Sequence, residues 1–110
     1  LYHLSNGEVF QYKGDRFPIG GIQYKGEYRF TDTRVIVNEG ESIYFFSDGL
    51  PDQFGGANKR KFGSKRIRNV LTENAGKEMS EMKQVFEEEL KSWMTGIKQL
   101  DDILMIGVKF

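Results

Sequence analysis

Residues 43–52 read Ile43-Tyr44-Phe45-Phe46-Ser47-Asp48-Gly49-Leu50-Pro51-Asp52, an apolar run that ends in a carboxylate and a turn. The run Ser42–Phe46 is nearly all apolar, which is typical of a short strand covered on both faces. A second apolar segment, residues 103–110, follows the pair Asp101-Asp102 and predicts a final strand. Both segments place carboxylates at the end of a strand, where a cation can be held without burying unpaired charge along it.

The size and composition of the chain limit its class. It has 110 residues, 16 basic and 16 acidic side chains, one histidine and no cysteine. This length suits one small domain, and the balanced charge gives no indication of a nucleic-acid or membrane partner. The absence of cysteine excludes disulfides and is compatible with a cytoplasmic location. Because the chain opens at Leu1 in what reads as a strand, we expect a piece of a longer protein, which an upstream sensor could anchor in a membrane.

The first half of the chain reads as strands and turns. Residues 1–4 and 8–12 flank Ser5-Asn6-Gly7, and Asn-Gly is typical of a hairpin turn because both residues tolerate positive φ. Alternating aromatic residues predict a half-buried strand over residues 24–32, and β-branched residues predict another over residues 33–37. A turn is expected over residues 38–41.

The second half reads as two helices and a strand. Ser64 is the expected N-cap of the first helix, which ends at Asn74-Ala75-Gly76. Apolar residues at three- and four-residue intervals from Met79 to Ile97 predict a second helix that buries one stripe. This order of elements predicts an α+β domain with an antiparallel sheet.

The carboxylates are the candidate functional groups. Oxygen ligands without cysteine favour Mg²⁺ or Mn²⁺ over zinc. Asp48 is either a ligand or an ordinary turn residue, since Asp-Gly favours tight turns. Asp101 and Asp102 either lie in a solvated turn or share a cation, which their mutual repulsion favours.

Basic residues provide the second candidate surface. A solvated loop and helix face is one interpretation, and docking of an acidic or phosphorylated partner is the other; a nucleic-acid interface lacks interleaved aromatic residues. Arg16, in a glycine- and proline-rich loop, meets a substrate phosphate or pairs with a carboxylate such as Asp15. The basic cluster comprises Lys59, Arg60, Lys61, Lys65, Arg66 and Arg68.

Taken together, these segments resemble the C-terminal half of the metal-dependent protein serine/threonine phosphatases (protein phosphatase 2C-like), in the bacterial SpoIIE-type branch. The resemblance runs nearly end to end and depends on the order and spacing of the segments, since each is common by chance. Its segments are Asp15-Arg16-Phe17-Pro18-Ile19-Gly20, Gly40-Glu41, Ser47-Asp48-Gly49-Leu50, Phe62-Gly63, Trp93 and Asp101-Asp102.

The resemblance implies an α/β/β/α sandwich of antiparallel sheets flanked by helices, with two Mn²⁺ or Mg²⁺ ions at one edge. It assigns Asp48 and Asp101 as metal ligands, Asp102 as the second member of its pair, and Gly49 to the metal-site loop. In the family an aspartate on an N-terminal strand bridges both ions. No residue of this chain matches it, so residues 1–110 are expected to form the C-terminal portion of the domain and to be inactive alone. Leu104 departs from the family, which usually has Thr or Ser there.

The implied function is hydrolysis of a phosphoserine or phosphothreonine ester on a small regulatory protein resembling an anti-sigma-factor antagonist. The alternative is a degenerate phosphatase fold that only docks a protein partner. For the 110-residue chain, unpaired strand edges predict a homodimer.

Overall fold

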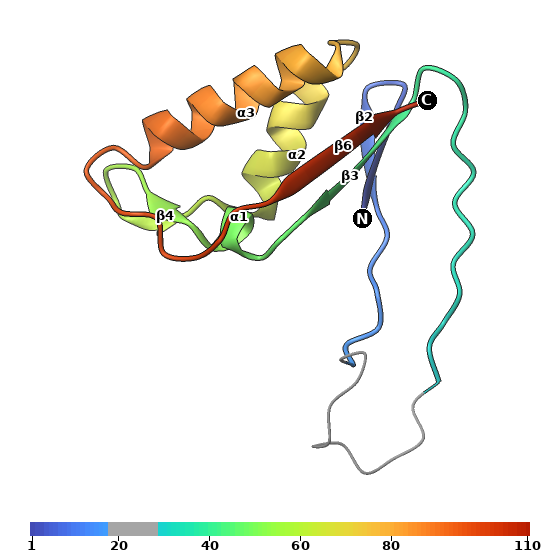
Figure 1. The fold of residues 1–110 in the computed structure, drawn as a ribbon, viewed down its shortest axis with the longest axis horizontal. Helices are drawn as coiled ribbons and strands as arrows, with labels where there is room; N and C mark the ends of the chain where they lie inside the picture. Colours follow the sequence, from blue (N-terminus) through green and yellow to red (C-terminus); the bar gives the residue numbers. More distant parts are fainter. Residues whose placement is uncertain (18–28) are drawn as a thin grey trace.

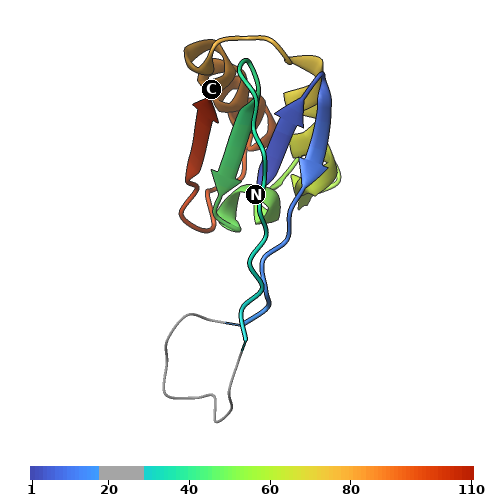
Figure 2. The same ribbon diagram turned by 90° about the vertical axis from the view of Figure 1, so that its right-hand side faces the viewer.

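Two helices pack on one face of a four-stranded antiparallel sheet in the computed structural model, which describes residues 1–17 and 29–110 (Figures 1 and 2). The sheet has the strand order β2-β1-β3-β6, and a separate two-stranded hairpin pairs β4 with β5. The elements are β1 (Tyr2–Ser5), β2 (Glu8–Gln11), β3 (Ser42–Phe46), α1 (Gly49–Asp52), β4 (Phe54–Gly55), β5 (Arg60–Lys61), α2 (Gly63–Glu73), α3 (Met79–Trp93) and β6 (Met105–Lys109).

The pairing of β3 with β6 brings two distant parts of the sequence to one end of the sheet. The two strands are antiparallel, and Phe46 at the end of β3 lies opposite Met105 at the start of β6. Residues that follow β3 therefore lie beside residues that precede β6. This register places Asp48 and the pair Asp101-Asp102 at the same end.

The core lies between the helices and the sheet, while the other sheet face carries exposed apolar side chains. Phe45, in the middle of β3, is 45% exposed and lies opposite Ile106, which is also exposed. The expectation that β3 is covered on both faces is wrong, because the described helices cover one face only. The buried apolar residues are Tyr2, Leu4, Tyr44, Leu50, Phe62, Ile67, Val70, Leu71, Met82 and Phe86.

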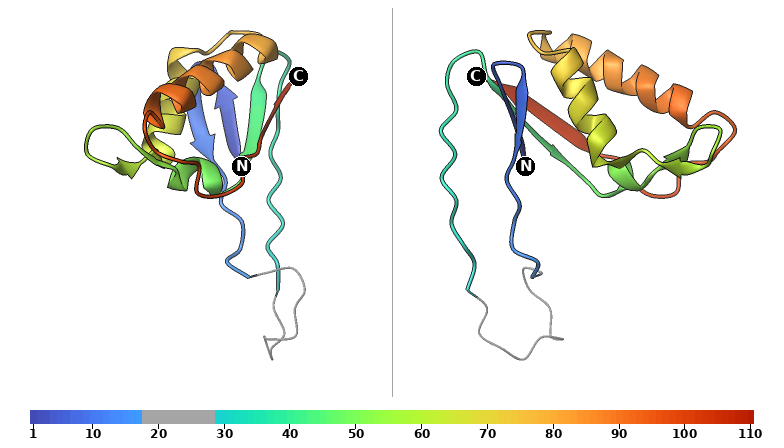
Figure 3. Two further views of the ribbon diagram at one scale, coloured as in Figure 1. Left: turned by 60° about the vertical axis from the view of Figure 1, so that its left-hand side comes forward. Right: turned by 180° about the vertical axis from the view of Figure 1, so that it is seen from behind.

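The hairpin prediction is confirmed, and the strands expected after it are not found in the described residues. Asn6 and Gly7 take φ values of 49° and 79° between β1 and β2. The strand expected over residues 24–32 falls partly within residues 18–28, which lie outside the described residues. Residues 29–37, which include the whole of the second expected strand, form no strand. Residues 12–17 and 29–39 instead leave the sheet as two extended segments (Figures 1 and 3). A run of β-branched residues forms a strand only beside a partner strand, so the β-propensity of residues 33–37 alone does not make them a strand.

Both helices are present, with shifted ends. Phe62, rather than the expected Ser64, occupies the N-cap position of α2, and its buried side chain packs edge-on against Trp93. Helix α3 begins with a capping box between Glu78 and Glu81. It ends before the predicted Ile97, because Gly96 adopts a φ of 76° just after it.

Glu41, in the turn before β3, ties that turn to β1. Its carboxylate accepts hydrogen bonds from the Asn38 N–H at 2.8 Å and from the Ser5 hydroxyl, and it pairs with His3 Nε2 at 2.9 Å. The Asn38 N–H first, then the Ser5 hydroxyl and the His3 ring, lower the pKa of Glu41 from 4.5 to about 2. The stabilisation is therefore present above pH 4.5 and is lost as the pH falls towards 2.

We expect Glu41→Gln to reduce the free energy of unfolding at neutral pH, and the difference from the native chain to shrink as the pH falls from 4.5 towards 2. Urea unfolding at a series of pH values measures this difference. Glu39→Gln, at an exposed neighbouring carboxylate, is the control. A Glu41→Gln deficit that does not vary with pH would contradict the prediction.

Candidate metal centre

Ser47 joins the two carboxylate-bearing segments. Its N–H donates to the Leu104 carbonyl at 3.0 Å, and its hydroxyl donates to the Asp102 carbonyl at 2.8 Å. The same hydroxyl accepts from the Leu104 N–H at 3.0 Å. These three bonds extend the β3–β6 pairing beyond both strand ends. Asp48, the next residue, is thereby fixed beside Asp102.

Gly49 lies in direct contact with the Asp102 backbone. A Cβ atom at position 49 would stand 2.3 Å from the Asp102 carbonyl oxygen and 2.9 Å from its carbonyl carbon. Position 49 must therefore be glycine for the two segments to approach this closely. Gly49, which the resemblance assigns to the metal-site loop, therefore lies where the two carboxylate-bearing segments meet.

The three carboxylates are exposed and retain free oxygen atoms. Asp101 Oδ1 accepts the Asp102 N–H at 2.8 Å, which orients that carboxylate and leaves its other oxygen open. Among the described residues, the carboxylates of Asp48 and Asp102 have no hydrogen-bond or ion-pair partner. Exposed oxygen ligands of this kind suit Mg²⁺ or Mn²⁺. The type of ligand therefore fits such ions, but the number of ligands does not make a complete site. Residues 1–17 and 29–110 hold no group of three or more His, Cys, Asp and Glu residues that could bind a metal ion.

Gln53 supports the segment before Asp101, and the sequence analysis missed it. Its side chain is 1% exposed. The Nε2 atom donates to the carbonyls of Phe54 at 3.0 Å and Lys98 at 3.1 Å, and Oε1 accepts the Leu100 N–H at 3.2 Å. Gln53 thus links the end of α1 to the loop that leads into Asp101. No sequence pattern marks a buried glutamine, so only the approach of the two loops reveals its role.

Arg16 shares an end of the sheet with the carboxylates but is not joined to them. Arg16 lies in the segment that follows β2. Strands β2 and β3 both end at the same end of the sheet, beside the start of β1. Within the described residues, no hydrogen bond or ion pair connects Arg16 to Asp48, Asp101 or Asp102. Its neighbour Asp15 accepts the Thr31 N–H at 2.6 Å rather than pairing with Arg16.

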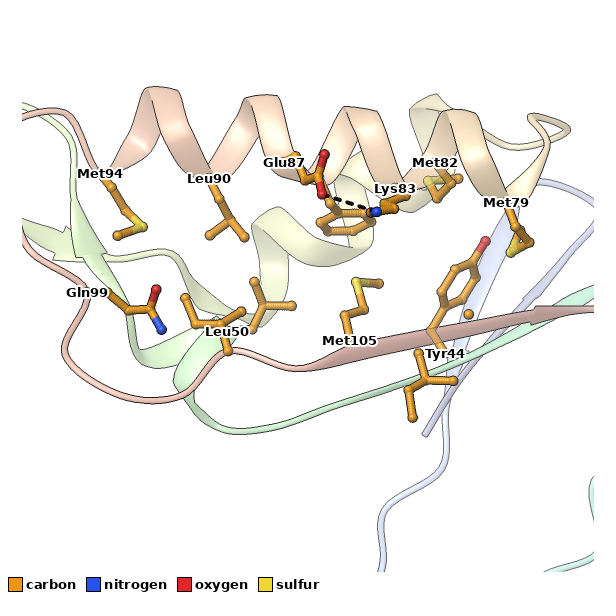
Figure 4. Close-up of a pocket in the computed structure, with 14 residues that line it drawn as sticks. Tyr44, Leu50, Met79, Met82, Lys83, Glu87, Leu90, Met94, Gln99 and Met105 are labelled. Atoms are coloured by element: carbon orange, nitrogen blue, oxygen red, sulfur yellow. Dashed lines mark ion pairs between the residues drawn. The ribbon is translucent and has the colours of Figure 1, made fainter.

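A cavity of about 640 Å³ between α3 and the sheet is a separate feature (Figure 4). Its lining is mainly apolar and includes Tyr44, Leu50, Met82 and Met105, with the Lys83–Glu87 ion pair on the helix above. None of the three candidate carboxylates lines it. A phosphate ester needs charged and hydrogen-bonding groups, so the carboxylate edge and not this cavity is the candidate site.

The fold is that of a phosphatase-type domain of the protein phosphatase 2C class. The structure matches the SiaA-PP2C domain of Pseudomonas aeruginosa with a TM-score of 0.85 and 30% sequence identity. The match covers 99% of this chain and 42% of that chain.

Sequence comparison gives the family. The chain matches the family of stage II sporulation protein E (SpoIIE) over residues 1–110, and it belongs to that family. The search of curated proteins gave no match. The predicted α+β, protein phosphatase 2C-like fold and the SpoIIE-type resemblance are both confirmed. In the described residues, no helix has the length and hydropathy to cross a membrane.

Proposed function

We propose that this domain is a metal-dependent protein serine/threonine phosphatase that acts on a small regulatory phosphoprotein of a partner-switching pathway in the cytoplasm. Membership of the SpoIIE family and similarity to a PP2C domain support the reaction class. The single observation that carries the site is the contact of Ser47 and Gly49 with the Asp102 backbone, which sets three exposed carboxylates at one edge.

In this proposal Asp48 and Asp101 bind divalent Mn²⁺ or Mg²⁺, and Asp102 supports them. Two bound ions, when present, supply an activated water and neutralise charge on the phosphoryl oxygens. The Asp101 carboxylate is held in place by the Asp102 N–H, and Ser47 fixes the spacing between the two segments. Because the chain spans 42% of the PP2C chain it matches, we propose that a bridging aspartate comes from outside these 110 residues and that the isolated chain is inactive.

The alternative is a phosphatase fold that only docks a partner, and Leu104 is the residue that favours it. Leu104 is 59% exposed and stands where the family usually has Thr or Ser. Its contribution to the edge is made by its backbone, which both donates to and accepts from Ser47. The side-chain departure therefore leaves the carboxylate geometry intact, which supports the enzyme.

The test is Mn²⁺-dependent phosphate release from a phosphoserine peptide and from p-nitrophenyl phosphate by the full-length protein in which this chain occurs. We expect Asp48→Asn to lower the rate by about 100-fold or more, since even outer partners of metal ligands contribute ~10–100-fold. Asp32→Asn, at an exposed carboxylate in another segment, should leave the rate unchanged. An inactive full-length protein at saturating Mn²⁺, or an Asp48→Asn variant with the native rate, would favour the docking module.

A further inference from the structure

Positive charge is concentrated on one part of this electrically balanced chain. Six of its 16 basic side chains lie within residues 59–68, and residues 53–72 contain no acidic side chain. The rest of the chain therefore holds ten basic side chains against sixteen acidic ones. We call this group the basic face; it consists of Lys59, Arg60, Lys61, Lys65, Arg66 and Arg68.

Most of these charges have no acidic partner. Lys61 pairs with Asp52 at 2.9 Å, and Arg66 pairs with Glu89 at 3.3 Å. The other four, Lys59, Arg60, Lys65 and Arg68, make no ion pair with any described residue.

On α2, the basic residues Lys65 and Arg68 are one turn apart and so lie on the same side of the helix. The buried residues Ile67 and Leu71 occupy the other side, towards the core. Lys65 is exposed and Arg68 is half-buried, so both charged groups lie on the solvent side of α2, where they can meet a partner.

Trp93, at the end of α3, holds the basic hairpin in place. The Gly56 N–H donates to the Trp93 carbonyl at 2.9 Å, and the indole Nε1–H donates to the Gln53 carbonyl at 3.3 Å. A Cβ atom at Gly55 would stand 2.1 Å from the Trp93 carbonyl oxygen, so the hairpin backbone packs directly on this residue. The Arg66 guanidinium lies 4.2 Å from the indole centroid. The hairpin and α2 therefore present their charges from a fixed arrangement.

The hairpin part of the basic face lies next to the carboxylate edge. Helix α1 starts directly after Asp48 and ends at Asp52, which pairs with Lys61 in the hairpin. Gln53, the next residue, bonds to the loop that leads into Asp101. Figures 1 and 3 show the hairpin beside α1 and this loop.

The packing of the nearby aromatic side chains argues against single-stranded nucleic acid as the occupant, since among the aromatic residues within 53–72 Phe54 alone is exposed (37%) and Phe62 is buried. Binding of that kind combines positive charge with aromatic rings on which bases stack. The Trp93 indole is covered by Arg66 and by the Gly55-Gly56 backbone, so it is not open to a base. Positive charge beside the carboxylate edge instead complements acidic side chains on a protein substrate.

We propose that the basic face binds acidic residues that flank the phosphoserine or phosphothreonine of a protein substrate, and so positions the phosphate at the carboxylate edge. This inference rests on the proposed phosphatase function. It names a recognition surface separate from the metal ligands.

The test uses two fluorescent phosphoserine peptides of equal length, one with acidic and one with neutral flanks, and the full-length protein. Binding is measured by fluorescence anisotropy, and turnover by phosphate release from both peptides and from p-nitrophenyl phosphate. The variants are the double changes Lys59→Glu/Arg60→Glu and Lys65→Glu/Arg68→Glu. Lys13→Glu/Lys77→Glu, at exposed lysines outside the basic face, makes the same change in net charge and is the control.

We expect the native protein to bind the acidic peptide about tenfold more tightly than the neutral one, with a preference that weakens as salt is added. Each basic-face variant should lose this preference and raise KM for the acidic peptide by about tenfold, with kcat and the p-nitrophenyl phosphate rate unchanged. Because the two variants change separate elements, the hairpin and α2, a folding defect in one of them would leave the other as a valid test.

Three results would overturn the proposal: equal affinity for the two peptides, an equal effect of the control variant, or tighter variant-sensitive binding of a single-stranded RNA oligonucleotide. Fluorescence anisotropy measures peptide binding even if the protein does not hydrolyse the peptide. A protein that binds the acidic peptide through the basic face but releases no phosphate would refute the phosphatase function and not the docking surface.

Discussion

Gly49→Ala is expected to reduce the Mn²⁺-dependent phosphatase rate of the full-length protein by about 100-fold, because misplacement of catalytic groups by about 1 Å has effects of this size. The added Cβ atom would stand 2.3 Å from the Asp102 carbonyl oxygen, which is a backbone atom and cannot rotate away. Either Asp48 or the segment Asp101-Asp102 must move. The shift would weaken the Ser47 hydrogen bonds and separate the carboxylates.

The same substitution should lower the free energy of unfolding by about 1–3 kcal/mol, which is typical of an overpacked site. Urea unfolding of the chain measures this change. Gly14→Ala is a matched control, since a Cβ atom there meets nothing within 4 Å, and it should stay within about 0.5 kcal/mol of the native chain. Equal stability of the two variants would show that the loop around Gly49 adapts without cost, and the argument for a fixed carboxylate edge would fail.

Local sequence patterns predicted the elements that depend on local interactions. The Asn6-Gly7 turn and the strand Ser42–Phe46 match the structure, because positive φ and an apolar run are properties of the residues themselves. The strand expected over residues 33–37 failed for the opposite reason, since it needs a partner strand that no local pattern reveals.

The short elements α1 and β4–β5 were missed, because tertiary contacts hold them. Helix α1 has four residues and each strand of the hairpin has two, too few for any periodicity to show. The hairpin depends on Trp93, more than thirty residues further along the chain, and on two glycines that pack against it. Gly107 in β6 also has a tertiary reason: a Cβ atom there would stand 2.8 Å from the Tyr44 ring, so glycine at this position makes room for a core residue.

The position of the candidate carboxylates at one end of the sheet could be predicted from the sequence, and the residues that hold those segments together could not. Asp48 and Asp101 were recognisable because each terminates or precedes an apolar run, and antiparallel pairing of those runs brings them to one end. The hydroxyl of Ser47 and the amide of Gln53 act through backbone groups more than forty residues away. Polar residues of these types are common, so their role depends on which loop passes beside them.

Gln53→Leu provides the second large effect. Leucine has a similar volume but leaves the carbonyls of Phe54 and Lys98 and the Leu100 N–H without the partner that the buried amide gives them. Three groups that lose a partner, at about 1–3 kcal/mol for each, should lower the free energy of unfolding by roughly 3 kcal/mol or more. Gln84→Leu makes the same substitution on the exposed face of α3 and should change stability by less than about 0.5 kcal/mol.

Metal dependence then separates a positioning role from a merely structural one. If Gln53 holds the loop that orients Asp101, then Gln53→Leu should raise the Mn²⁺ concentration for half-maximal activity by about tenfold, with KM for p-nitrophenyl phosphate unchanged. Binding of Mn²⁺ followed by electron paramagnetic resonance, in the absence of substrate, should show the same loss. Gln53→Glu keeps an acceptor for Leu100 but loses the donor to Lys98, so it should fall between the native protein and the leucine variant. A variant that is less stable yet has the native Mn²⁺ affinity would assign Gln53 to the fold alone, because the loop would then hold Asp101 in place without the amide.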